Sequence, residues 1–128
     1  MRGARPPLRE EALRLVAARF RVLGHPLRLR LLQALERGER TVSALAAETG
    51  ATQPNVSKHL RLLEESGLVR RRQEGMNVMC AVADESVLEL CDVVCHSVRG
   101  RLAVQAGLFE RGARVAVRRT RTRAALRR

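Results

Sequence analysis

Residues 41–67 have the sequence TVSALAAETGATQPNVSKHLRLLEESG, and this stretch predicts two helices joined by a tight turn. Thr41 is a suitable N-cap for the first helix, and Gly50 can adopt the left-handed conformation that ends it. Thr52 is the next suitable N-cap, for a second helix that continues to about Ser66. The proline in its first turn costs no hydrogen bond there. Two helices joined this closely are typical of a helix-turn-helix.

The second predicted helix carries polar side chains beside an apolar face formed by Val56, Leu60 and Leu63. In a major groove, amide and hydroxyl side chains can read base edges, while lysine and arginine suit phosphates or guanine. The amides at the start of such a helix also favour a phosphate. We therefore expect DNA contacts from Thr52, Gln53, Asn55, Ser57, Lys58, His59 and Arg61.

A basic hairpin is predicted directly after these helices. Residues 68–72 favour a strand, 73–77 favour a turn, and 78–82 favour a return strand. Beside a recognition helix, such a hairpin is a wing whose arginines contact the DNA backbone or the minor groove. The expected DNA contacts of this wing are Arg70, Arg71 and Arg72.

Apolar stripes predict three further helices around this centre. One covers 8–20. A second covers 22–35, and Pro26 either breaks it or stands near its start. A capping box at Ser86 begins a long last helix, which we expect to end within 107–112. The predicted fold class is mainly α with a small β-hairpin, a winged helix-turn-helix.

The net charge of +12 over 128 residues indicates a polyanionic partner. Eight arginines and no acid lie in 111–128, so most of this charge belongs to the end of the chain. We expect an N-terminal extension over 1–7, a folded domain over 8–112 and a disordered basic tail over 113–128. The tail can bind DNA phosphates without sequence preference, or it can be a solvated end.

The remaining composition excludes several classes of protein. No apolar run reaches the roughly 20 residues of a membrane span, and no secretory signal is recognisable, which predicts a cytoplasmic protein without a membrane partner. The three cysteines should then be reduced thiols. Two aromatic residues are too few for stacking on single-stranded nucleic acid. No catalytic motif is present, so we expect neither an enzyme nor a required cofactor.

Several segments resemble the motifs of a known family. LGHPLRL at 23–29 is similar to its LGxPxRLxIL segment. QPNVSKHLRLL at 53–63, followed by GLV at 67–69, is similar to its SxVSxHLxxLxxAGLV recognition helix, and 70–75 is similar to its wing. Over about residues 8–108, the chain thus resembles the ArsR/SmtB family of metal- and stress-responsive repressors.

This resemblance implies a homodimer that forms through the first and last helices, binds a double-stranded DNA operator of dyad symmetry and is released by an inducer. The last predicted helix supports dimerisation, because one small domain can hardly bury its whole apolar stripe. That stripe consists of Val87, Cys91, Val94, Val98 and Leu102. A protein-interaction module that reuses the fold without specific DNA binding is the alternative.

The cysteines are candidate metal ligands for an inducer. Cys91 and Cys95 lie four residues apart on the last helix, so their sulfurs share one face and suit a soft ion such as arsenite, antimonite, Hg(II) or Cd(II). Packing in an apolar core explains both residues equally well. Cys80 alternates with valines in the return strand, which favours the core, although it would complete a three-thiolate set if it turned toward the last helix. Thiol oxidation or persulfide formation is the alternative inducer chemistry.

Other inducer sites of the family fit this chain less well. The zinc-sensing type implied by the resemblance uses aspartate and histidine residues along the last helix, and here no second histidine follows Asp92 and His96. A cysteine pair in the first helices or in the recognition helix is excluded, because no cysteine precedes Cys80.

Overall fold

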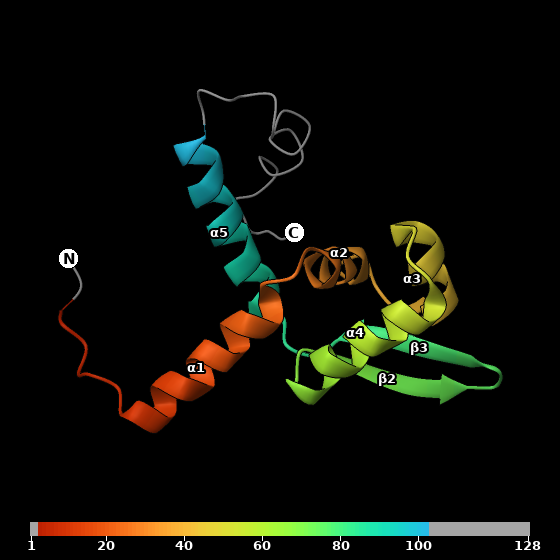
Figure 1. Cartoon of the computed structure of the whole chain (residues 1–128), viewed down its shortest axis with the longest axis horizontal. Helices are drawn as coiled ribbons and strands as arrows, with labels where there is room; N and C mark the ends of the chain where they lie inside the picture. The colour runs from red at the N-terminus through yellow and green to blue at the C-terminus, as the bar shows by residue number, and fades with distance from the viewer. Residues whose placement is uncertain (1–2, 103–128) are drawn as a thin grey trace. The chain divides into compact units, whose positions relative to one another are not determined.

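The structure is a computed structural model that describes residues 3–102. The chain divides into two units, residues 1–85 and residues 86–128, and Figure 1 shows their described helices and strands. The first unit holds four helices, α1 to α4, and a three-stranded sheet, and the described part of the second is the single helix α5, Ser86–Arg101. No helix of the described part is long and apolar enough to cross a membrane.

The elements of the first unit follow the predicted order, with one additional strand. Its helices are α1 (Glu10–Leu23), α2 (Pro26–Leu35), α3 (Val42–Thr49) and α4 (Gln53–Glu65), and its strands are β1 (Arg40–Thr41), β2 (Val69–Glu74) and β3 (Asn77–Val82). The strands are antiparallel in the order β1-β3-β2. The short strand β1 escapes prediction because two residues carry no periodicity of their own.

The predicted helix-turn-helix is confirmed in its boundaries and caps. The Thr41 hydroxyl accepts a hydrogen bond from the Ala44 amide at 3.0 Å, and the Thr52 hydroxyl accepts one from the Asn55 amide at 3.3 Å. Gly50 lies in the left-handed region, with φ of 77°, where a side chain would be strained. Each helix of the motif is therefore fixed by signals within its own sequence.

The connection between α1 and α2 resolves the alternatives at Pro26. The chain breaks at Gly24, and α2 begins at Pro26. His25 is the N-cap of α2, and its Nδ1 accepts a hydrogen bond from the Leu27 amide at 3.1 Å. Pro26 is tolerated because a backbone N–H at this position would have no acceptor within the helix, so its absence costs no hydrogen bond.

The wing is a longer hairpin than the sequence predicts. Its pairing extends from Val69 opposite Val82 to Glu74 opposite Asn77, so only Gly75 and Met76 remain in the turn. Gly75 has φ of 61°, as a two-residue hairpin turn requires. The hairpin lies beside α4 (Figure 1).

The core of the first unit consists of aliphatic side chains drawn from α2, α3, α4 and the sheet. Each contributes on the order of 1.5–3 kcal/mol when fully buried. The side chains with the least exposure are Leu31, Leu32, Leu45, Val56, Leu60, Leu63, Leu68, Val69 and Cys80. The buried faces of α3 and α4 pack on this core, and the opposite face of α4 carries polar residues.

The two terminal helices expose large apolar side chains within their own units. On α1 these are Leu13, Leu15, Val16 and Phe20. On α5 they are Val93, Val94 and Val98. The predicted basic tail over 113–128 and the predicted helix end within 107–112 lie outside the described residues.

Candidate nucleic-acid interface

The recognition surface is the exposed face of α4 and the residue that caps it. Val56, Leu60 and Leu63 are completely buried and fix the orientation of the helix. The polar residues predicted to contact DNA lie mostly on the other side. Thr52, Gln53, Asn55, Lys58 and Arg61 are exposed, and Ser57 is half-buried.

The N-terminal end of this face combines a helix dipole with base-reading groups. The Thr52 hydroxyl accepts a hydrogen bond from the Asn55 amide, and Pro54 has no N–H. This leaves the Gln53 amide of the first turn for an acceptor outside the helix, beside the exposed side chains of Gln53 and Asn55. Amide side chains suit adenine edges, and the helix end suits a phosphate. The arrangement can thus place base-reading and phosphate-binding groups side by side.

His59 departs from the prediction. Only 6% of this residue is exposed, and its Nδ1 accepts a hydrogen bond from Arg28 Nε at 3.0 Å. The expectation that it faces outward with the polar residues is wrong. Its position three residues after Val56 places it on the buried face, because residues at i and i+3 share one side of a helix.

Two wing arginines have partners within the chain. Arg70 Nη1 donates a hydrogen bond to the Val82 carbonyl oxygen at 2.9 Å. Arg71 donates to Glu64 Oε1 through both Nε and Nη2, each at 2.9 Å. Arg71 therefore links the wing to the last turn of α4.

The third wing arginine forms the most extensive ion pairs of the hairpin. Arg72 donates to both carboxylate oxygens of Glu39, at 2.9 and 3.2 Å, and to Glu74 at 3.0 Å. The hydrogen bond from Arg72 lowers the pKa of Glu39. Glu39 and Glu74 offset part of the positive charge of the three consecutive arginines. The arginine sequence alone does not predict these acidic partners.

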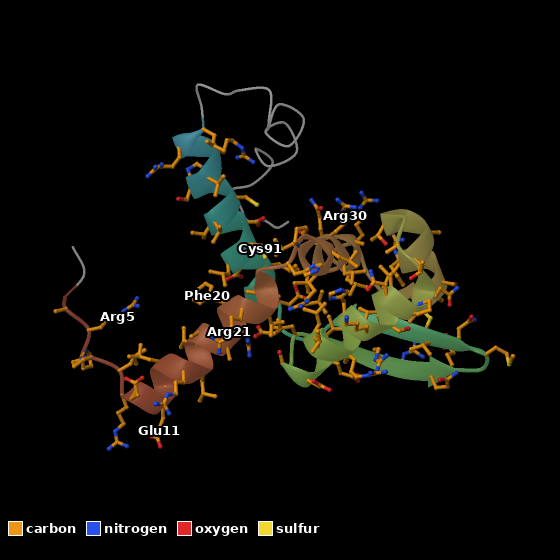
Figure 2. The ribbon with its side chains drawn as sticks, viewed as in Figure 1. Arg5, Glu11, Phe20, Arg21, Arg30 and Cys91 are labelled. Atoms are coloured by element: carbon orange, nitrogen blue, oxygen red, sulfur yellow. The ribbon has the colours of Figure 1, made fainter. Side chains whose placement is uncertain are left out.

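Arg30 is a cation that sequence reasoning missed. It projects from α2 (Figure 2) and is exposed. Its Nη1 donates to the Thr49 carbonyl oxygen at 3.5 Å, so the guanidinium lies at the turn between α3 and α4. A phosphate near the start of α4 would meet this charge as well as the helix dipole.

The cysteines lie in different environments. Cys80 is fully buried in β3, and burial raises the pKa of its thiol to about 11. Cys91 on α5 is half-buried (Figure 2), and Cys95 is exposed. Desolvation and, next in importance, the Asp92 carboxylate raise the pKa of the Cys95 thiol. Within residues 3–102, no disulfide links these cysteines, and no three His, Cys, Asp or Glu side chains are grouped to hold a metal.

Known proteins are similar to this region in sequence. A family model described as a helix-turn-helix domain matches residues 23–72. The probable mercury resistance operon repressor of Streptomyces lividans is 42% identical over 71 residues, which are 56% of this chain and 57% of that protein. A homolog of the transcriptional repressor SmtB from Synechocystis sp. is 42% identical over 71 residues, which are 56% of this chain and 54% of that protein. The match thus spans little more than half the length of these two relatives.

A solved structure is similar over a larger share of the chain. It is the homodimeric winged helix-turn-helix DNA-binding domain of a Mycobacterium bovis protein described as a possible ArsR-family transcriptional regulator. The TM-score is 0.66 at 34% identity, and the match covers 78% of this chain and 94% of that one.

Proposed function

Because the chain belongs to the ArsR/SmtB family of winged helix-turn-helix transcriptional regulators, we propose that it is a repressor that binds a double-stranded DNA operator as a homodimer and is released by an inducer. The observation that carries this proposal is the polar, exposed face of α4 above a completely buried apolar face. A protein that reads DNA works where the DNA is, so we place it in the cytoplasm.

Dimerisation is supported by the apolar surface of the terminal helices. The exposed side chains of α1 and α5 are large and aliphatic or aromatic, and a second copy would remove them from water. The similar domain from Mycobacterium bovis is described as homodimeric. Two copies related by a dyad would present two recognition helices to a palindromic operator.

For the inducer, we propose a soft metal or metalloid ion held by Cys91 and Cys95. Their spacing places both sulfurs on one side of α5, and neither is as buried as Cys80. A relative is named a probable mercury resistance operon repressor, which fits thiolate chemistry. One chain offers two thiolates here, and a homodimer offers two such pairs. Cys80 is the weaker candidate ligand because its burial in the core suits packing.

Thiol oxidation or persulfide formation at Cys91 and Cys95 is the second candidate. It is supported by the partial exposure of these two thiols. The raised pKa of Cys95 lowers the thiolate fraction at neutral pH, which slows oxidation and weakens ion binding alike. We rank the soft ion first because a relative is named a probable mercury resistance operon repressor.

The test is fluorescence anisotropy of the fully reduced protein on a labelled duplex from its own upstream region, with excess non-specific DNA. Arsenite, Hg(II) and a persulfide donor are then titrated separately. We expect specific binding, followed by release with one of the two ions. Release by the persulfide donor alone would favour the redox alternative. Absence of specific binding would favour an interaction module over a repressor.

A further inference from the structure

A cluster of three side chains joins α2 and α4 to the end of α1. Arg28, in α2, donates from Nε to His59 Nδ1 at 3.0 Å and from Nη1 to the Val22 carbonyl oxygen at 2.8 Å. The His25 ring lies against the His59 ring, with 4.4 Å between centroids and 43° between planes. One guanidinium therefore bonds both the last turn of α1 and the buried face of the recognition helix.

We infer that Arg28 is a positioning residue for DNA recognition, which holds α4 in place through neutral His59, and that protonation of His59 releases this hold and weakens operator binding. The inference rests on the proposed function. Arg28 and His59 would affect operator binding without contacting the DNA.

The chemistry of the two side chains makes the bond dependent on charge. A guanidinium only donates hydrogen bonds and stays charged, so Arg28 can bond Nδ1 only when that nitrogen carries no proton. In that state the imidazole proton is on Nε2. A protonated ring would turn a donor toward a donor and bring two cations to hydrogen-bond distance.

The surroundings oppose that protonation. Burial lowers the pKa of His59 most, followed by the positive charges of His25, Arg28 and Lys58. His25 faces it from the N-cap of α2, Arg28 from α2 itself and Lys58 from its own helix. Neutral His59 is thus the state at neutral pH, and the bond with Arg28 is intact there.

The position of the cluster links the Arg28–His59 hydrogen bond to DNA recognition. Base reading needs side chains held to within about half an ångström, and the proposed base-reading residue Asn55 shares α4 with His59. Val22 lies in the last turn of α1, whose exposed apolar side chains we assign to the dimer. Arg28 therefore fixes the orientation of α4 relative to α1. In the proposed dimer, α1 also helps to set the distance between the two recognition helices and so the spacing of the operator half-sites.

The first arm of the test observes the pair without DNA. Nitrogen-detected NMR of the full chain should show His59 in the Nε2–H form, with a pKa below the ordinary histidine value. Arg28→Met removes the donor and one nearby cation, so it should raise the pKa of His59 and shift amide signals in α4. A His59 pKa at or above the ordinary histidine value in the unmodified chain would overturn the inference.

The second arm measures operator binding by anisotropy between about pH 8 and about pH 5. Arg28→Met should weaken specific binding about tenfold or more at the upper pH, with unchanged helical content. His59→Asn offers an amide oxygen in place of Nδ1 and cannot titrate. It should keep affinity within about threefold and flatten the loss of binding at low pH. His96→Gln is the matched control and should keep the original profile.

A purely structural role would not give rescue by asparagine or a flattened profile. If Arg28→Met leaves operator affinity unchanged, or if His59→Asn keeps the original pH profile, the inference fails and the proposed function stands. If the unmodified chain binds no operator at any pH, the proposed function fails, and the inference fails with it.

Discussion

Arg72 bonds both carboxylate oxygens of Glu39, at 2.9 and 3.2 Å, and so ties the wing to the connection between α2 and β1. The same guanidinium would be a natural phosphate ligand if the acid were absent. The pair thus sets a limit on how strongly the wing attracts DNA.

Glu39→Gln should therefore strengthen DNA binding. The change removes a negative charge and leaves Arg72 paired with Glu74 alone, so that Nε and Nη2 can reach a phosphate. We expect severalfold tighter binding to any duplex and a steeper dependence on salt, by about one counterion. Anisotropy at a series of salt concentrations measures the slope. Glu10→Gln, which removes another exposed paired acid, on α1, should leave the slope unchanged. Equal slopes for both variants would remove Arg72 from the interface.

The Glu39 pair also predicts an effect of acid on the wing. The hydrogen bond from Arg72 lowers the pKa of Glu39 in the folded chain, so the pair stabilises the fold above the ordinary glutamate pKa. That contribution is lost as the pH falls through the lowered value. Both side chains are exposed, and the effect should be small. The protection factors of β2 amides, corrected for the intrinsic exchange rate at each pH, should fall on acidification, and Glu39→Gln should reduce that fall.

Asn55→Ala and Lys58→Ala should separate specific from general affinity. Asn55 offers an amide to a base edge, so its loss should cost about tenfold or more on the operator and little on random DNA. Lys58 offers charge, so its loss should weaken both complexes alike. Both residues are exposed, and thermal unfolding should shift little. Glu65→Gln, at the far end of α4, is the control. Equal losses from both alanine variants on both DNAs would contradict the assignment of Asn55.

Cys91→Ser and Cys95→Ser should each abolish release by the soft ion while keeping operator affinity within about twofold. The reason is that two thiolates are the smallest set that can chelate an ion on one helix face. Cys80→Ala should retain release, because its thiol is buried and has a pKa of about 11. Titration of the ion into preformed operator complex measures release. Loss of release in Cys80→Ala alone would transfer the site to the sheet.

Gly50→Ala should destabilise the domain by about 1–2 kcal/mol, because alanine is strained at the positive φ of this turn. A Cβ at Gly50 would meet no atom within 4 Å, so the cost comes from the backbone alone. Gly50→Asn should cost less, since asparagine tolerates the left-handed region. Urea unfolding measures the difference. An alanine variant as stable as the asparagine variant would contradict this origin of the cost.

The helix-turn-helix was predictable because its signals are local. Thr41, Gly50 and Thr52 each act on residues no more than four positions away. The same holds for the start of α2, where His25 and Pro26 form the first turn. Local hydrogen bonds can be recognised from residue types and spacing alone, and so these boundaries agree with the structure.

The contacts that prediction missed join residues far apart in the chain. Arg28 and His59 are separated by 31 positions, and Arg72 and Glu39 by 33. A run of arginines indicates charge and does not indicate which acids neutralise it. The apolar spacing from Val56 could have placed His59 on the buried face, but its polar side chain favoured the exposed one. The pairing of β1 with β3 is likewise set by the tertiary fold.

The separation of the two faces of α4 has an evolutionary consequence. Substitutions at Gln53, Asn55 or Arg61 remove no buried contact, so a lineage can drift toward a new operator without risking the fold. Paralogues could then diverge after gene duplication by changing a few codons on one side of one helix. His59 differs from these residues, because losing its bond with Arg28 would disturb the position of the whole recognition helix.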